Sequence, residues 1–264
     1  MQNALMAGLL ASIACGIIGT LVVVNRIVFI SGGIAHAAYG GVGLAFFLCF
    51  APLLGVVGFS VAIAIIIALV SLGNKQRADT IIGVLWAVGM ALGIMLADLT
   101  PGYKVDLMTY LFGSILAVPR EDLLLMLFLN VAILGTVVLF YKDFLAMSYD
   151  EEFAGLMGVP TRALYIALLI MIALCVVIII RVVGMILIIA FFTIAPYMAE
   201  GQSRSLYSMM LLSILYNCVF ALAGLWLSFR FNLTSGATII LVGAAFFFLS
   251  LFLRKFAKML KVGS

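Results

Sequence analysis

The chain has 264 residues, of which 67% are hydrophobic and only 9% are charged, against about 45–50% and about 25% in an average soluble domain. So few charges cannot cover the surface of a soluble globule, which excludes that class and predicts a polytopic membrane protein. The formal net charge of +4 is no argument for nucleic-acid binding, because in a membrane protein the placement of the charges matters more. The first residues, MQNALMAGLL, lack the basic region and the cleavage site of a signal peptide, so we expect the first apolar run to be retained.

Apolar runs long enough to cross a hydrocarbon core of about 30 Å follow one another along the chain. They occupy residues 1–25, 27–74, 80–97, 123–141, 163–180, 182–199, 205–229 and 231–253. The second run is too long for one crossing, and the Pro and Gly residues of APLLGVVG (51–58) divide it into two spans. The predicted fold class is therefore all-α, a transmembrane bundle of nine spans. It has eight if the glycine-rich segment 31–51 is broken or only partly inserted.

Residues 163–199 are read as two spans. A single helix over this range would be about 55 Å long, and it would place Arg181 at mid-membrane at a cost of roughly 2.5–3.5 kcal/mol. Two spans put Arg181 at an interface, with Gly184 as the residue that helps the turn.

The basic residues set the predicted orientation. With the N-terminus outside, the inner segments carry ten of the 14 Lys and Arg residues and the outer segments carry four, as the positive-inside rule requires. The tail RKFAKMLKVGS is then cytoplasmic, beside anionic lipid. On the outer side, residues 98–122 are too short and too mixed to span, and we expect a short interfacial helix from about 107 to 117.

The inner polar segment 148–160, here called the docking segment, contains a predicted short helix. Ser148 or Asp150 would cap it, with Glu151 and Glu152 in the favourable first turn. An apolar stripe then follows at helical spacing, formed by Phe153, Leu156 and Met157. Two interpretations stay open: a surface helix that only joins two spans, or a helix on which a soluble partner docks.

Enzyme chemistry is not indicated. The chain has no HExxH, GxSxG or P-loop motif and one histidine, so any active transport would draw its energy from another chain. The spans lack the intramembrane acids and arginines usual in secondary transporters. The cysteines are read as small buried hydrophobes and not as disulfides or metal ligands; they are Cys15, Cys49, Cys175 and Cys218. The remaining interpretation is a membrane pore, or one half of a permease, with a single group of polar residues, here called the polar focus.

That focus surrounds His36. On a helix, one face would hold the imidazole together with glycines and a tyrosine, namely Gly32, Tyr39, Gly40 and Gly43. Small-residue pairs, Ala37 with Gly41 and Gly89 with Gly93, would let helices approach closely. The imidazole is either satisfied by a neighbouring carbonyl or hydroxyl, or it is a ligand or gate for a passing cation. The second interpretation requires a symmetric dimer, because one histidine cannot form a metal site.

Other polar residues lie within or at the ends of spans. Asn130 and Asn217 are expected to form interhelical hydrogen bonds. Pro196 frees backbone groups near the inner end of its span. Glu200 closes that span, either as an interfacial anchor or as part of an exit path.

Five stretches between residues 29 and 200 resemble, in order, the integral membrane permeases of metal ABC importers, which carry zinc, manganese or iron(II) into bacteria and archaea. FISGGIAHAAYGGVGLAF is similar to the family's segment with Asp, three residues, then His followed by Ala and Gly. SYDEEFAGLMGVP resembles the family's cytoplasmic coupling helix. The other three are ADTIIGVLWAVGMALGIML, YLFGSILAV and VVGMILIIAFFTIAPYMAE.

This resemblance implies a single permease domain over 1–264 with a fold like that of type II ABC importers, in the plasma membrane of a bacterium or archaeon. It implies a dimer with a second copy or a paralogue, a cytoplasmic ABC ATPase, and an extracytoplasmic protein that delivers the metal. No cofactor would be bound permanently. The ATPase would dock on residues of the docking segment, namely Asp150, Glu151, Glu152, Phe153, Gly155 and Gly158.

One position departs from the family pattern. Where the family has its acid, four residues before the histidine, this chain has Gly32. His36 is therefore carried over as a pathway residue without its partner, and Tyr39 or Glu200 are the substitutes to consider. Zinc is the first expected cargo, with manganese or iron second. An importer for a chelate such as haem or a siderophore is the alternative, and a non-transport membrane protein is the remote one.

Overall fold

The computed structural model describes residues 2–73, 78–100, 115, 118–182, 184 and 188–262. Every regular element in this part of the chain is a helix, which confirms the all-α class. The helices are α1 (Gln2–Val24), α2 (Val28–Ala37), α3 (Tyr39–Phe47), α4 (Pro52–Gly73), α5 (Ala78–Asp98), α7 (Arg120–Leu139), α8 (Tyr141–Tyr149), α9 (Glu151–Leu156), α10 (Thr161–Val182), α11 (Ile188–Glu200), α12 (Leu206–Phe231) and α13 (Ser235–Val262).

Within the described residues, eight helical segments are long and apolar enough to cross a membrane, which confirms a multi-pass protein. Residues 28–47 count as one of them, made of α2 and α3 on either side of Ala38. The predicted span 182–199 needs correction, because α11 begins only at Ile188 and has 13 residues, about 20 Å. The choice between eight and nine spans therefore rests on α11 and not on the segment 31–51. The predicted interfacial helix 107–117 lies outside the described residues.

The turn after α10 uses the predicted glycine. Arg181 is the last residue but one of α10, so it lies at the end of a span, as expected. Gly184 has a φ of 83°, a left-handed conformation that glycine adopts without steric cost. α10 ends at Val182 and α11 begins at Ile188, so residues 163–199 do not form one long helix, as predicted.

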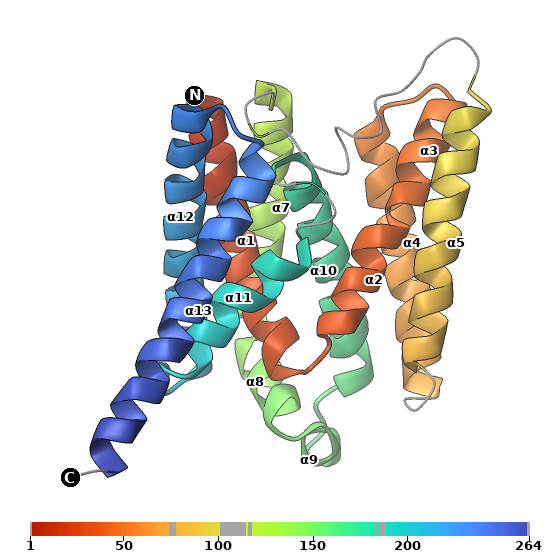
Figure 1. Cartoon of the computed structure of the whole chain (residues 1–264). Helices are drawn as coiled ribbons and strands as arrows, with labels where there is room; N and C mark the ends of the chain where they lie inside the picture. Colours follow the sequence, from red (N-terminus) through yellow and green to blue (C-terminus); the bar gives the residue numbers. More distant parts are fainter. Residues whose placement is uncertain are drawn as a thin grey trace.

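Figure 1 shows which elements share each end of the bundle. The N-terminus lies at the same end as the start of α7 and the end of α12. The short helices α8 and α9 lie at the opposite end, as does the C-terminus. The docking segment and the basic tail therefore share one end, as the charge pattern predicts.

The spans differ in how deeply they are buried. About three quarters of α1 and of the α2–α3 span lies inside the protein (72% and 78%), against 22% for α5 and for α13. The first two therefore belong to the interior of the bundle, and α5 and α13 to its periphery. Figure 1 shows α3, α4 and α5 side by side, set apart from α12 and α13.

Glycines bring α3 against α4 and α5. Gly43 lies against the main chain of Gly93, and Gly41 against that of Gly55, with no room for a side chain between them. Gly89 packs in the same way on Ala37. The small-residue pairs predicted from the sequence therefore form the helix contacts, since small residues permit close backbone approach in lipid.

Gly43→Ala is expected to destabilise the protein. The added methyl group would collide with the backbone of Gly93, which cannot move as a side-chain tip can, and overpacking of this kind costs about 1–3 kcal/mol. Gly58→Ala is the matched control, because a Cβ there meets nothing within 4 Å and alanine favours a helix by about 1 kcal/mol. Thermal unfolding in detergent should show a lower midpoint for the first variant and an equal or higher one for the second. Equal stability of both variants would contradict this account.

Two expectations about polar residues are wrong in the described part of the chain. The Asn130 amide donates to the carbonyl of Met126 in its own helix, at 2.9 Å, and not to another helix. The Asn217 amide is fully buried and has no hydrogen-bond partner among the described residues.

Pro196 lies inside α11, where its missing N–H leaves the carbonyl of Phe192 without the usual partner. Gly19 of α1 packs directly on that carbonyl.

All four cysteines are free, as predicted. Cys15 and Cys175 are buried, whereas Cys49 is exposed at the turn after α3 and has a positive φ of 56°. The expectation of a buried residue is therefore wrong for Cys49, because α3 ends at Phe47 and leaves it outside any span.

Candidate functional site

His36 lies on α2 and faces α5. Its imidazole stacks on the indole of Trp86, with ring centroids 4.2 Å apart and an angle of 28° between the planes. Phe29 lies about two helical turns before His36 on α2, and its ring centroid is 6.1 Å from that of the same indole. The histidine therefore points toward another helix, and an aromatic partner fixes its plane.

The hydrogen bond of His36 determines its tautomer. Nδ1 lies 3.0 Å from the carbonyl oxygen of Gly32, and a carbonyl only accepts, so Nδ1 carries the proton. In neutral imidazole Nε2 then holds a free lone pair, which is the form that binds first-row divalent metals. A backbone carbonyl that orients the other ring nitrogen is the usual support of a metal-binding histidine.

The depth of His36 makes its exposure informative. It lies eight residues after the start of α2, about 12 Å along the helix axis, and is only half-buried. A polar ring at that depth is costly against acyl chains, so such residues face protein or a water-filled space. This surface of α2 and α5 is therefore one that protein or water covers.

The other predicted pathway residues do not join His36. The side chain of Tyr39 is buried (2% exposed) and packs on Gly93. Glu200 is the exposed last residue of α11. Within the described ranges, no group of three or more His, Cys, Asp or Glu side chains is placed to hold a metal ion.

Gly32, at the position where the resembled family carries Asp, is a point of close helix packing. A Cβ on Gly32 would lie 2.8 Å from Cδ1 and 3.1 Å from Cγ1 of Ile189 on α11. Ile189 therefore occupies the space into which a side chain at residue 32 would extend. The glycine supplies its carbonyl to His36 in place of a carboxylate.

The docking segment folds as the sequence predicts. Asp150 has an extended conformation, and its side chain accepts from the backbone N–H of Phe153 at 2.9 Å. It is the N-cap of α9, and Glu151 and Glu152 occupy the first turn, where the helix dipole favours acids. The alternative cap, Ser148, lies inside α8 instead and accepts from the amide of Asn25 at 2.9 Å.

An apolar surface projects from this short helix. Gly158 ends it with a φ of 87°, and Gly155 accepts a hydrogen bond from the N–H of Gly158 at 3.1 Å. The exposed apolar side chains around it, here called the α9 patch, are Tyr149 (93% exposed), Phe153 (60%), Leu156 (87%) and Met157 (70%). A group of exposed apolar side chains outside the spans is typical of a protein interaction surface.

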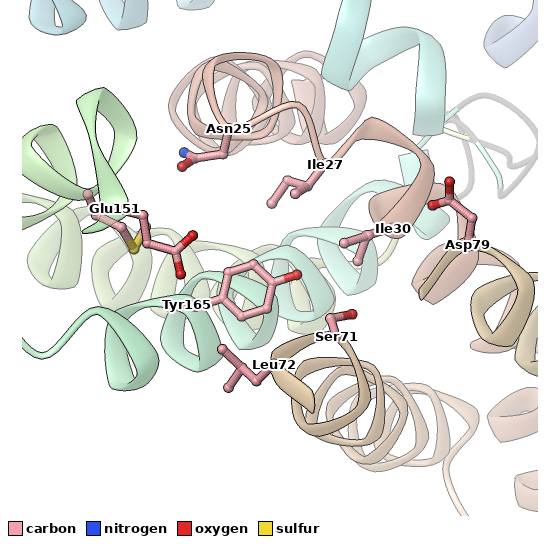
Figure 2. Close-up of a pocket in the computed structure, with 9 residues that line it drawn as sticks. Asn25, Ile27, Ile30, Ser71, Leu72, Asp79, Glu151 and Tyr165 are labelled. Atoms are coloured by element: carbon pink, nitrogen blue, oxygen red, sulfur yellow. The ribbon is translucent and has the colours of Figure 1, made fainter. Parts of the chain in front are cut away.

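A cavity of about 230 Å³, lined by both polar and apolar side chains, lies beside the first residue of α9. Figure 2 shows it between the α1–α2 turn, the end of α4, the start of α5 and the helices around α9. Its lining residues are Asn25, Ile27, Ile30, Ser71, Leu72, Asp79, Met147, Glu151 and Tyr165. Glu151, the first residue of α9, shares this cavity with residues of α4 and α5, so the cavity links the docking segment to the helices beside His36.

The sequence does not identify Trp86 or, apart from Glu151, the residues that line the cavity. Trp86 is one of two tryptophans in the chain and lies in the stretch ADTIIGVLWAVGMALGIML, which resembles the family. A rare residue in that stretch was a signal from which Trp86 could have been proposed as a functional residue. Asn25, Ser71 and Tyr165 gave none, because single polar residues near span ends are common and only the fold brings these together.

These features define a class, an all-helical membrane permease with a short, capped helix carrying exposed apolar side chains at one end and no nucleotide-binding motif in its sequence. The model of the ABC 3 transport family matches residues 1–254, and the chain belongs to this family. It is 49% identical to an uncharacterized membrane protein of Synechocystis sp., over 97% of this chain and 91% of that protein.

Two further comparisons carry more information. The manganese transport system membrane protein MntC of Halalkalibacterium halodurans is 31% identical, over 96% of this chain and 86% of the relative. The solved structure of PsaBC from Streptococcus pneumoniae in complex with Fab matches with a TM-score of 0.85 at 32% identity, covering 94% of this chain and 90% of that one. The fold is therefore that of a known family of transport permeases.

Proposed function

We propose that this chain is the membrane permease of an ATP-driven importer of divalent transition-metal ions. The observation that carries the proposal is the match to the ABC 3 transport family over nearly the whole chain, together with the similarly complete match to a manganese transport permease. Metal ions in this proposal are cargo and not resident cofactors.

Manganese is the first candidate cargo and zinc the second. Zinc is the first expectation from the sequence, but the relative named above for a single metal is a manganese protein.

The energy enters through the α9 patch, where a cytoplasmic ABC ATPase docks. Three observations support this: the capped helix, its exposed apolar side chains, and the cavity that joins Glu151 to α4, α5 and α10. Closure of the ATPase pair on ATP shifts α9, and the shift reaches the helices beside His36 through the walls of that cavity. This assignment makes the α9 end cytoplasmic and the N-terminus external.

The pathway lies between two permease copies. His36 presents a free Nε2 on a half-buried surface at membrane depth, and a second copy across a two-fold axis supplies the protein cover and the second imidazole that a cation needs. An extracytoplasmic metal-binding protein delivers the ion to the N-terminal end of this seam.

The test is uptake into proteoliposomes that contain the permease, its ATPase and the external binding protein. We expect ATP-dependent accumulation of Mn²⁺, with Zn²⁺ slower, and none without ATP. If neither metal accumulates while the assembled complex hydrolyses ATP, the proposal is wrong about the cargo. If the chain assembles with no ATPase, it is wrong about the class.

A further inference from the structure

A second concave site lies far from α9, between the first turns of α1 and α7. It is an open groove of about 590 Å³, more than twice the volume of the cavity in Figure 2. The two helices begin at the same end of the bundle (Figure 1), so both contribute their first residues to the same end of the groove. We call it the α1–α7 groove.

The groove changes from polar to apolar along its length. Gln2 and Asn3 of α1 and Arg120 of α7 line its mouth. One helical turn and more into the membrane, the lining becomes Met6 and Leu9 of α1 with Leu124 and Leu127 of α7. These four side chains are 41–70% exposed, so the walls of the groove are open to the bilayer.

A hydrogen bond links the two sides of the groove at its mouth. The Asn3 amide donates to the carbonyl of Val118 at 3.2 Å, which ties the start of α1 to the residues just before α7. Arg120 is exposed and has no ion pair or hydrogen bond among the described residues. The acids that follow it, Glu121 and Asp122, do not line the groove, because successive helical residues point about 100° apart.

We propose that the α1–α7 groove binds a glycerophospholipid of the leaflet at the N-terminal end of the bundle. The phosphate contacts the Arg120 guanidinium, and an acyl chain lies along Met6, Leu9 and the leucines of α7. Charge complementarity favours this occupant, since the exposed Arg120 guanidinium at the mouth of the groove matches a phosphate in charge and geometry. An apolar wall at membrane depth excludes water as the resident. The inference is independent of the transported metal.

Native mass spectrometry of the detergent-purified chain, titrated with dioleoylphosphatidylglycerol, tests the proposal. We expect one tightly retained lipid, and Arg120→Gln should lower its retention about fivefold, the usual effect of one basic residue near anionic lipid. Arg230→Gln is the control, because Arg230 is an exposed arginine at the same end of the bundle that does not line the groove. Dioleoylglycerol, with the same chains and no phosphate, should bind far more weakly.

The apolar part of the groove is tested by filling it. Leu124→Trp should displace the lipid, whereas Leu241→Trp should not, although both leucines are 70% exposed and only Leu124 lines the groove. Equal retention of the two lipids, an equal effect of the two arginine variants, or full retention in Leu124→Trp would each overturn the proposal. These substitutions are at exposed positions, so we expect the variants to fold. Unchanged midpoints of thermal unfolding would verify that they do.

Discussion

Phe153→Ala is expected to abolish most ATP-driven transport while leaving the permease folded. Phe153 belongs to the α9 patch and is 60% exposed, so it contributes little to the stability of the permease itself. Buried at an interface with the ATPase, an aromatic anchor of this kind is worth about 2 kcal/mol or more, which weakens binding roughly thirtyfold. The measurement is the dissociation constant of the ATPase for the nanodisc-embedded permease, followed by ATP-dependent Mn²⁺ uptake.

Phe229→Ala is the matched control for this experiment. Phe229 is also 60% exposed, but it lies near the end of α12, at the opposite end of the bundle. The control should bind the ATPase as the unaltered chain does. If Phe153→Ala binds equally well, the α9 patch is not the docking surface, and the interpretation of 148–160 as a simple connecting segment would be correct.

The docking segment was predictable because its determinants are local. An N-cap, acids in the first turn and apolar residues at spacings of three and four all act within one or two helical turns, and the structure confirms Asp150 as the cap. The span pattern was predictable for a similar reason, since uncharged length determines what crosses a bilayer. The short α11 was not, because its sequence is as apolar as that of a full span, and apolar length alone does not show that the helix begins at Ile188.

The surroundings of His36 depend on contacts distant in sequence. Periodicity placed the histidine on a face with glycines, but it gave no information on which helix that face meets. The stacking on Trp86 and the close approach of Ile189 to Gly32 come from α5 and α11. The same limitation explains the error at Asn130, whose amide found a carbonyl in its own helix where an interhelical partner was expected.

His36→Ala is expected to reduce Mn²⁺ uptake by about tenfold or more, the scale on which changes around metal ligands alter affinity or activity. The physical reason is the loss of the Nε2 lone pair, which the Nδ1 hydrogen bond to Gly32 keeps available. The initial rate of ATP-dependent uptake into proteoliposomes measures the effect. ATP hydrolysis by the assembled complex should persist, because His36 lies in α2 and not in the docking segment.

His36→Phe separates the lone pair from the packing of the ring. Phenylalanine can keep a stack on Trp86 like the one the imidazole makes at 4.2 Å, but it cannot bind a cation through a nitrogen. We therefore expect the Phe variant to lose uptake as the Ala variant does. Retained uptake in His36→Phe would show that the ring is needed only for packing, and the pathway role of His36 would be withdrawn.

The substitution Gly32→Asp tests the role of His36 through an expected gain in apparent affinity for Mn²⁺. A carboxylate at this position shares a helix face with the imidazole four residues on, so the two can bind one ion together. The new side chain needs the space now filled by Ile189 Cδ1, 2.8 Å from the site of the Cβ, and Ile189→Val removes that atom. The double variant should lower the Mn²⁺ concentration for half-maximal uptake, and adding His36→Phe should cancel the gain. A gain that survives without the imidazole would mean that the carboxylate acts alone and that Gly32 and His36 are not parts of one site.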